Sequence, residues 1–405
     1  MPRLLLLAAL AVLPYLTSLP LPFISDDYEQ IARARQYGAP AQWGELAKDP
    51  LYRCRATSLV LTRATEAVAG LNPVAYRATS LALHLLAVFA VLWLAALAGA
   101  PPNVAFAAAA FFAVQEGHQE AVIWYAAVPE LLVFLCCAAT VGAWLLWQRS
   151  GDARWYFAAL AAFLAALASK ESAVAVVPVL ALLALARRRW PAALPFGILA
   201  VLYFLASWTA ARDHLHFNDG TFRIHAGALW NWANSFARLF WIWGLAALAA
   251  LAATGFWRKH PTLLAQAFLW IGSALVPYCF LTYMDRVPSR HTYLASAGLA
   301  VVVGLGYTAL ESHRRLALAA ALAVVLHNAG YVWVKKQPQF ARRAEPTEQV
   351  IAFAQQHRAP FTLECFPYSD WIAIRAVEVG AGLPPSLVRP KGSPAPARFC
   401  YAGKL

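Results

Sequence analysis

The chain has 405 residues, of which 61% are hydrophobic and 13% are charged, and its net charge is +13. Ordinary soluble proteins carry about 25% charged residues, so a soluble fold of this composition would expose large apolar patches to water. Lipid covers such surface, and a helix satisfies its own backbone polar groups inside a bilayer. The excess Arg and Lys fall in short segments between apolar runs, which favours a membrane protein and argues against a nucleic-acid partner.

Eleven apolar runs predict the architecture, an all-α polytopic membrane protein. A spanning helix needs about 20 mostly apolar residues, and several of the runs are shorter than that. The first run contains three prolines late in its length and is followed by no convincing small-residue cleavage site, so we interpret it as a retained helix. The runs lie at about residues 3–23, 74–98, 103–117, 128–148, 154–169, 172–187, 191–211, 229–255, 260–283, 292–311 and 315–334.

Charged turns between the runs predict the side of the membrane on which each turn lies. Four turns carry Arg and Lys with little acid, so the positive-inside rule places them in the cytoplasm. The opposite side then holds a first outer loop, 24–73, and everything after about residue 335. We expect a multi-pass protein of a bacterial inner membrane, with its active site on the periplasmic or extracellular side. The charged turns contain Arg149, Arg154, Arg187, Arg188, Arg189, Arg258, Lys259, Arg314 and Arg315.

The first outer loop and the C-terminal tail have mixed compositions that predict folded structure outside the membrane. In the loop, residues 27–37 and 56–68 have the pattern of amphipathic helices that lie along a membrane surface. In the tail, a helix at 346–356 with Pro346 near its start, a strand at 361–366 and a helix at 371–379 predict a small α/β appendage. We therefore divide the chain into a transmembrane catalytic domain, 1–335, and a non-cytoplasmic domain, 336–405. Within that domain, two cysteines are candidates for a disulfide if it faces an oxidising compartment, namely Cys365 and Cys400.

An acidic pair follows the first apolar run. Asp26 and Asp27 are adjacent at a membrane boundary, where two carboxylates are costly to desolvate and repel each other. Such a pair serves chemistry, or it caps the helix that follows, or it is simply solvated at the start of the loop. The residues alone leave these interpretations open.

A second polar segment combines acid, imidazole and aromatic side chains at the outer end of the third run. It contains His118 and Glu120, followed by Trp124 and Tyr125. The aromatic pair forms either an interfacial belt or a surface on which a sugar stacks. His118 and Glu120 are two residues apart, which is not the spacing of a metal-binding pair on a helix.

Basic residues recur at the same outer rim. Arg53 and Arg55 lie in one polar cluster and suit a phosphate, or they contact lipid headgroups or solvent. Lys170 and Glu171 lie between two runs with almost no loop, so they form a plain turn or pair with groups across the bundle. Arg290 and Tyr293 are three residues apart and share a helix face, which suits a phosphate-bearing ligand.

The order and common sidedness of these motifs resemble those of the GT-C superfamily of polytopic glycosyltransferases. The nearest resemblance is to the protein O-mannosyltransferases and the lipid A aminoarabinose transferase type, and it covers about residues 1–310. This chain has Arg53-Cys54 where the family has Arg-Pro. The matching segments are Asp26-Asp27, Gly70-Leu71-Asn72-Pro73, Leu83-His84-Leu85, Gly117-His118-Gln119-Glu120-Ala121-Val122, Lys170-Glu171 and Ser289-Arg290-His291-Thr292-Tyr293.

The resemblance implies a membrane glycosyltransferase that moves a sugar from a polyprenyl-phosphate-linked donor to a protein, lipid or glycan outside the cytoplasm. It implies that Asp26 or Asp27 acts as the base or orients the acceptor, in an inverting single displacement. The residues it assigns to the lipid phosphate are Lys170, Arg290, Tyr293 and Arg53. Those assigned to acceptor or sugar contacts are His118, Glu120, Trp124, Tyr125 and Glu171.

The residues also allow one cofactor and two other functions. A divalent metal could be held by Asp26, Asp27 and His118, if the fold brings them together. A lipid-linked glycan ligase or polymerase would need a larger donor site. A transporter or flippase is a different class, and such proteins often show inverted repeats and mid-membrane charges, which this sequence does not display.

Overall fold

Glycine, asparagine and proline define the turn that follows the first outer loop. Helix α4 (Ala56–Ala69) ends at Gly70, whose φ of 59° lies in the region that favours glycine. Helix α5 (Pro73–Leu97) then begins with a proline, which has no backbone N–H. This costs no hydrogen bond, because an N–H at the first position of a helix has no partner within the helix. The Asn72 side chain accepts a hydrogen bond from the Val74 N–H at 3.1 Å and caps α5. This segment is therefore a tight link between an outer helix and a bundle helix.

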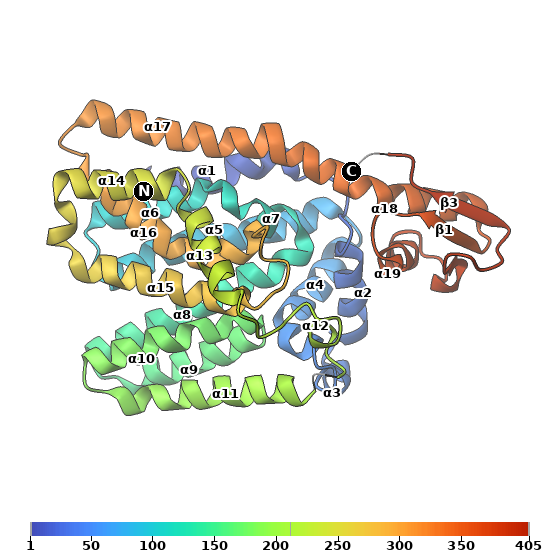
Figure 1. Ribbon diagram of the computed structural model, residues 1–405, viewed down its shortest axis with the longest axis horizontal. Coiled ribbons are helices and arrows are strands. Elements are labelled where there is room, and N and C mark those ends of the chain that lie inside the picture. Colours follow the sequence, from blue (N-terminus) through green and yellow to red (C-terminus); the bar gives the residue numbers. More distant parts are fainter. Residues whose placement is uncertain (1, 211, 404–405) are drawn as a thin grey trace.

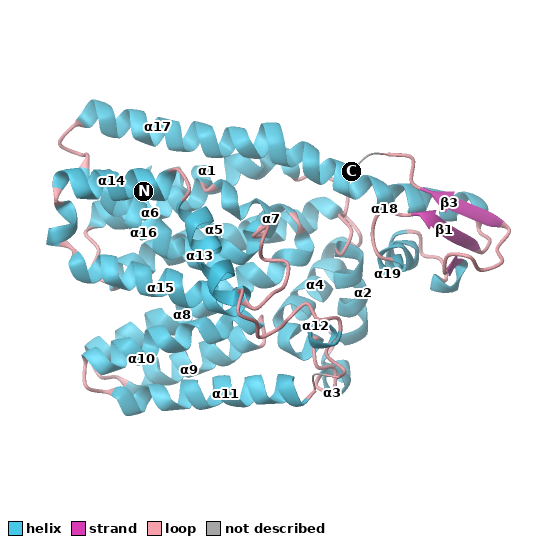
Figure 2. Cartoon of the chain, in the orientation of Figure 1, coloured by secondary structure: helices cyan, strands magenta, loops and turns pink. Residues whose placement is uncertain are grey.

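The computed structural model describes residues 2–210 and 212–403, which form a long helical bundle with a small sheet beyond one end (Figures 1 and 2). Within those residues, six helices are long and apolar enough to cross a membrane. A seventh results if α13 (Ala228–Phe240) and α14 (Trp243–Thr254), bent by 74°, count as one span. Besides α5, α13 and α14, the bundle contains α1 (Pro2–Val12), α6 (Pro102–Val114), α8 (Val128–Ser150), α9 (Ala153–Leu167), α10 (Val176–Ala186), α11 (Leu194–Thr209), α15 (Pro261–Cys279), α16 (Tyr293–Ala309) and α17 (Arg314–Tyr331).

The predicted apolar runs all fall on helices, so the helical architecture is confirmed. Four of them correspond to apolar helices of 10–17 residues, and the number of membrane crossings stays a prediction. The run at 229–255 is not one straight helix as expected. It breaks at Ile242, which adopts a φ of 61°.

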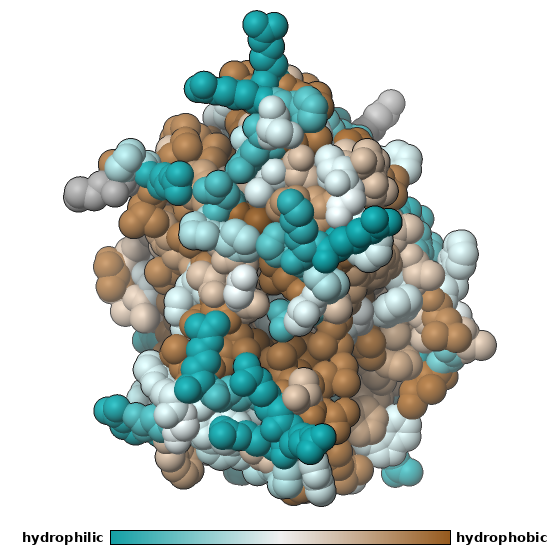
Figure 3. Space-filling model, turned by 90° about the vertical axis from the view of Figure 1, so that its left-hand side faces the viewer, coloured by the Kyte–Doolittle hydropathy of each residue, from teal (hydrophilic) through white to brown (hydrophobic). Residues whose placement is uncertain are grey.

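The charged turns gather at one end of the bundle. The turns between α10 and α11, between α14 and α15, and between α16 and α17 lie together at this end (Figure 1). Figure 3 looks at the same end and shows hydrophilic side chains in separate patches among apolar surface. The first outer loop and the sheet lie at the opposite end. Along the sides, large apolar side chains such as Ile198, Leu202 and Leu322 are exposed, as a lipid-facing surface requires.

The two helices predicted in the first outer loop are confirmed, at α2 (Asp27–Tyr37) and α4. They pack against each other, and the buried Gln30 amide donates to Thr62 at 3.1 Å and to Ser58 at 3.3 Å. Shorter helices complete this end of the molecule. They are α3 (Trp43–Leu46), α7 (Gln119–Ile123) and α12 (Leu215–Asn218).

The C-terminal helix is longer than the sequence suggested. Helix α17 continues through a π turn at Val332–Lys336 into α18 (Gln337–His357). The domain boundary expected at residue 335 therefore falls inside one continuous helical run. Pro346 lies in the interior of α18, and the proline in its first turn is Pro338.

The tail ends in a small parallel sheet, so the predicted α/β appendage is confirmed. Strand β1 (Phe361–Cys365) is central, with β2 (Val388–Arg389) on one side and β3 (Ala397–Cys400) on the other. Helix α19 (Asp370–Arg375) follows β1. A disulfide joins Cys365 to Cys400 and so fixes β1 to β3.

Candidate active site

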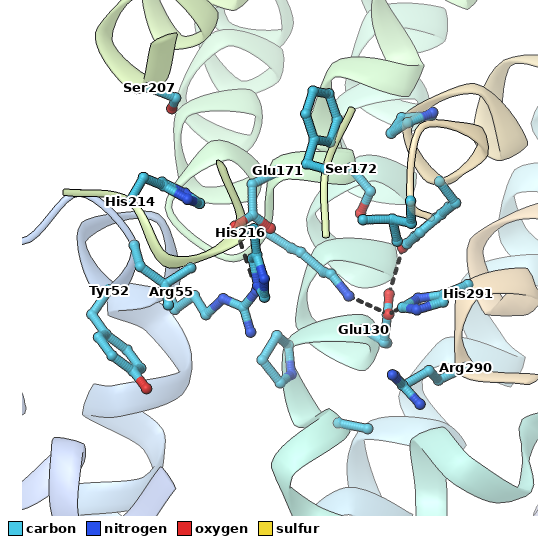
Figure 4. Close-up of a pocket in the computed structure, with 18 of the residues that line it drawn as sticks. Tyr52, Arg55, Glu130, Glu171, Ser172, Ser207, His214, His216, Arg290 and His291 are labelled. Atoms are coloured by element: carbon cyan, nitrogen blue, oxygen red, sulfur yellow. Dashed lines mark hydrogen bonds and ion pairs between the residues drawn. The ribbon is translucent and has the colours of Figure 1, made fainter. Parts of the chain in front are cut away.

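A cavity of about 460 Å³ opens at the end of the bundle that carries the first outer loop. Its wall comes from that loop, from the start of α8, from the segments before α10 and α16, and from the loop after α11 (Figure 4). Apolar side chains form part of the wall. The titratable residues that line it are Asp26, Glu29, Tyr52, Arg55, Glu130, Lys170, Glu171, Tyr203, His214, His216, Tyr278, Tyr283, Arg290 and His291.

The two adjacent aspartates differ in their surroundings. Asp27 is fully buried, and its carboxylate accepts hydrogen bonds from the Ile24 N–H at 2.8 Å and the Ala126 N–H at 2.7 Å. Asp26 is half-buried and lines the cavity. Asp26 is therefore accessible from the cavity, whereas Asp27 joins the first outer loop to the segment before α8.

Burial and nearby charges set the acidity of this pair. Burial raises the pKa of Asp27 to about 6. Burial also raises the pKa of Asp26, while the positive charges of Arg343 and Arg290 act in the opposite direction. A carboxylate with a raised pKa is, once ionised, a better proton acceptor than an ordinary aspartate.

A buried carboxylate organises one wall of the cavity. Glu130 is 1% exposed and forms an ion pair with Lys170. Its other contacts are the Tyr278 hydroxyl, which donates at 2.7 Å, and His291 Nδ1 at 3.2 Å. Figure 4 shows Glu130 at the centre of these contacts. Because three polar groups converge on it, Glu130 holds Lys170 and His291 in place at the cavity surface.

A second charged pair lies across the cavity. Arg55 Nη2 is 3.4 Å from Glu171 Oε1. The rings of His214 and His216 lie beside this pair, with their centroids 5.8 Å apart (Figure 4). Burial and then the positive charge of Arg55 lower the pKa of His216 to about 4, so its imidazole is neutral at pH 7.

Two guanidinium groups share one indole ring. Arg290 lies 5.0 Å from the centre of the Trp124 ring, and Arg343 lies 4.6 Å from it. Both also approach Glu120, at 3.4 Å and 3.9 Å respectively. Trp124 lines the cavity, but these cations occupy space over its ring and leave less of it for a sugar.

Arg290 also lines a second, more polar cavity of about 790 Å³. Glu116 and Glu120 belong to the wall of this second cavity, and Glu120 does not line the first one. The Arg290 side chain therefore stands between the two cavities.

Two of the predicted contact residues are fully buried elsewhere. The Tyr293 hydroxyl forms a hydrogen bond with His84 Nδ1 at 2.9 Å. His118 Nε2 forms one with the Ser296 hydroxyl at 2.8 Å. Neither side chain lines either cavity, because both point into the aromatic core around Phe112. The geometry gives them packing roles, and we do not retain them in the site.

Two further predicted residues also line neither cavity. Tyr125 is buried, with its hydroxyl 3.1 Å from the Thr62 hydroxyl. Arg53 donates to the Ala206 carbonyl at 2.8 Å and ties the first outer loop to the end of α11. Of the basic residues expected at the phosphate, the structure brings Lys170 and Arg290 together with Asp26 in one cavity.

The predicted metal ligands do not converge. The Asp27 carboxylate is held by two backbone N–H groups, and His118 lies in the aromatic core. Across residues 2–210 and 212–403, no group of three His, Cys, Asp or Glu side chains is arranged to hold a metal ion. The use of a divalent metal stays a prediction.

Sequence reasoning missed several residues of the cavity wall. Glu130 was passed over as part of an apolar run, although an acidic residue in a spanning segment is itself a functional signal. Arg55 belongs to the same polar cluster as Arg53, but the family resemblance points to Arg53 alone, and the structure places Arg55 at the cavity. Trp371 lies in the C-terminal domain, and no local pattern connects it with a cavity formed by the bundle.

Comparisons with known proteins bear on the fold. No family model matches the sequence, and no curated protein matches it. Among solved structures, the chain is similar to the oligosaccharyltransferase of Archaeoglobus fulgidus in a complex with Zn and sulfate, with a TM-score of 0.55 and 11% identity over 95% of this chain and 62% of that one. A structure of the same protein, tethered with an acceptor peptide containing the NVT sequon via a disulfide bond, gives the same score and identity and is covered to 63%.

This similarity establishes the class of fold. The chain shares the overall fold of that oligosaccharyltransferase, and this fold agrees with the expected GT-C architecture. The chain spans less than two thirds of the length of the oligosaccharyltransferase. The closer resemblance to O-mannosyltransferases and aminoarabinose transferases stays a prediction.

Proposed function

We propose that this chain is a membrane glycosyltransferase that moves a sugar from a polyprenyl-phosphate-linked donor to an acceptor outside the cytoplasm. One observation carries the proposal: Asp26, Lys170 and Arg290 line the same cavity, at the end of the bundle opposite the Arg-rich turns. A carboxylate for the acceptor and cations for a departing phosphate are the two groups that such a transfer requires.

The proposed reaction is a single displacement at the anomeric carbon. Asp26 takes the proton of the acceptor hydroxyl as the acceptor oxygen forms its bond to that carbon. The bond from the carbon to the phosphate oxygen breaks, and the lipid phosphate leaves with the electron pair. Lys170 and Arg290 stabilise the charge that grows on the phosphate. Attack opposite the leaving group inverts the anomeric configuration.

The apolar wall of the cavity supports a lipid-linked donor. Val174, Val276, Pro277 and Phe280 line it beside the charged residues. A prenyl chain needs an apolar path from the bilayer to the reacting phosphate, and these side chains provide apolar surface at the cavity itself.

We also propose the orientation and the location. Eleven membrane crossings would place the Arg-rich turns in the cytoplasm and the cavity on the periplasmic or extracellular side of a bacterial inner membrane. The disulfide between Cys365 and Cys400 supports this, because disulfides persist in oxidising compartments. A lipid-linked glycan ligase is the second candidate, because the two similar solved structures described above are of an oligosaccharyltransferase.

The test uses purified protein in lipid nanodiscs with radiolabelled polyprenyl-phosphate sugars, and membrane lipids and membrane proteins of the source cell as acceptors. Release of sugar-free polyprenyl phosphate and transfer of label are both measured. We expect Asp26→Asn to lower the transfer rate at least about 100-fold. Asp285→Asn is the matched control, because Asp285 is exposed on the same side and lines neither cavity. Full transfer by Asp26→Asn would refute the assignment of the base.

A further inference from the structure

Three buried nitrogen atoms in the cavity wall have no hydrogen-bond partner among the described residues. They are Arg55 Nε, His214 Nδ1 and His216 Nδ1. His214 as a whole is only 3% exposed. Buried polar atoms in folded proteins are almost always paired, so a cluster of unpaired ones beside a cavity indicates a ligand that pairs with them.

The backbone around Arg55 is anchored on both sides. Before it, Arg53 donates to the Ala206 carbonyl at 2.8 Å. After it, the Thr57 N–H donates to the Ala168 carbonyl at 3.2 Å, and the Thr57 hydroxyl donates to the Ser169 hydroxyl at 2.8 Å. The first outer loop is thus fixed to the end of α11 and to the turn after α9. Arg55 is preorganised to receive a ligand at low entropic cost.

These nitrogens lie apart from the cations of the proposed reaction. In Figure 4, Arg55, His214 and His216 project from one side of the cavity, and Arg290 and His291 project from the other. Lys170 is held by Glu130 on the second side. A single phosphate at Lys170 and Arg290 would leave Arg55 Nε and the two imidazole Nδ1 atoms unpaired.

We propose that Arg55, His214 and His216 form a second anion subsite, which binds a second phosphate group. The inference rests on the proposed function and deepens it. A guanidinium and two neutral imidazoles supply N–H donors to phosphate oxygens. The Glu171 carboxylate, 3.4 Å from Arg55, opposes an anion and shares the guanidinium with it. The second phosphate belongs either to a diphosphate-linked donor or to a phosphorylated acceptor.

The first experiment measures inhibition of sugar release by polyprenyl phosphate and by polyprenyl diphosphate. If the donor supplies the second phosphate, the diphosphate inhibits the wild type at least about tenfold more strongly. Arg55→Gln and His216→Asn then bring the ratio of the two inhibition constants close to one. His357→Ala is the control, because His357 is exposed on α18, outside the cavity, and this variant keeps the wild-type ratio.

The second experiment examines the acceptor, with a phosphorylated glycolipid and its dephosphorylated form. If the acceptor supplies the phosphate, Arg55→Gln and His216→Asn raise the KM of the phosphorylated form alone. Wild-type turnover with neither a diphosphate preference nor such a KM effect would overturn the subsite. The subsite is also overturned if a chelator abolishes the effects of Arg55→Gln and His216→Asn, because a metal site would then explain those effects. Absence of any turnover in the wild type would instead count against the proposed function.

Discussion

Arg375 Nε lies 2.7 Å from Glu29 Oε2 and joins the C-terminal domain to the helix that begins beside Asp26. A Cβ on Gly380 would lie 3.0 Å from the Tyr28 ring, so the two parts also pack closely. Trp371, one turn before Arg375, lines the cavity. The C-terminal domain therefore helps to position α2 and completes the cavity wall.

Removing this link should weaken catalysis more than stability. We expect Arg375→Ala to lower the transfer rate about tenfold, because α2 would no longer be held against the C-terminal domain. Arg375→Lys should recover part of the rate. The control is Arg398→Ala, since Arg398 is exposed on β3. Rates are measured by sugar transfer and folding by thermal unfolding in detergent. An unchanged rate in Arg375→Ala would show that the contact does not position the site.

The pH profile should report Asp26. The base must be ionised, so kcat/KM should fall as the pH is lowered. Because burial raises the pKa of this carboxyl, the midpoint of that fall should lie at a pH above the ordinary aspartate value of 3.8. Arg343 favours the charged form, so Arg343→Ala should move the midpoint upward by up to about one pH unit. Arg342→Ala is the matched control, because Arg342 is exposed and adjacent. A downward shift in Arg343→Ala would contradict the assignment.

Asp27 should matter for folding. In Asp27→Asn, an amide NH₂ replaces one of the oxygens that now accept the Ile24 and Ala126 N–H groups. The buried N–H left without an acceptor should cost about 1–3 kcal/mol of unfolding free energy. Thermal unfolding of Asp27→Asn and Asp26→Asn side by side provides the measurement. If Asp26→Asn is the less stable of the two, the roles of the pair are reversed.

The buried pair of Glu130 and Lys170 should show strong coupling. Glu130→Gln leaves Lys170 without its ionic partner at 12% side-chain exposure, and we expect a loss of about 3–5 kcal/mol. The double variant Glu130→Gln/Lys170→Gln should lose less than the sum of the two single variants, because no unpaired charge remains. Unfolding in mixed detergent with rising dodecyl sulfate gives the four values. Additive losses would mean that the two side chains act independently.

Local patterns in the sequence were enough for the helices and for part of the site. The alternation of apolar and polar residues placed α2 and α4 correctly, because amphipathic periodicity depends on neighbours along one helix. The strand at β1 was found for a similar reason. The acidic pair was recognised as a candidate, yet the sequence could not say which carboxylate meets the cavity.

Tertiary packing decided the rest. Tyr293 follows Arg290 by one helical turn, and only the packing of α16 shows that its hydroxyl meets His84 in the core. The role of Glu130 cannot be predicted from the apolar run that contains it, because its three partners come from other segments.

The apolar runs by themselves determined that this is a helical membrane protein with its basic turns on one side, because burial in lipid constrains composition residue by residue. The structure alone decided that Asp26, Arg55 and Glu130 share one cavity. Residues so far apart in the chain meet only when helices pack, and the free energy of that packing is spread over the whole core and is not encoded in any short segment.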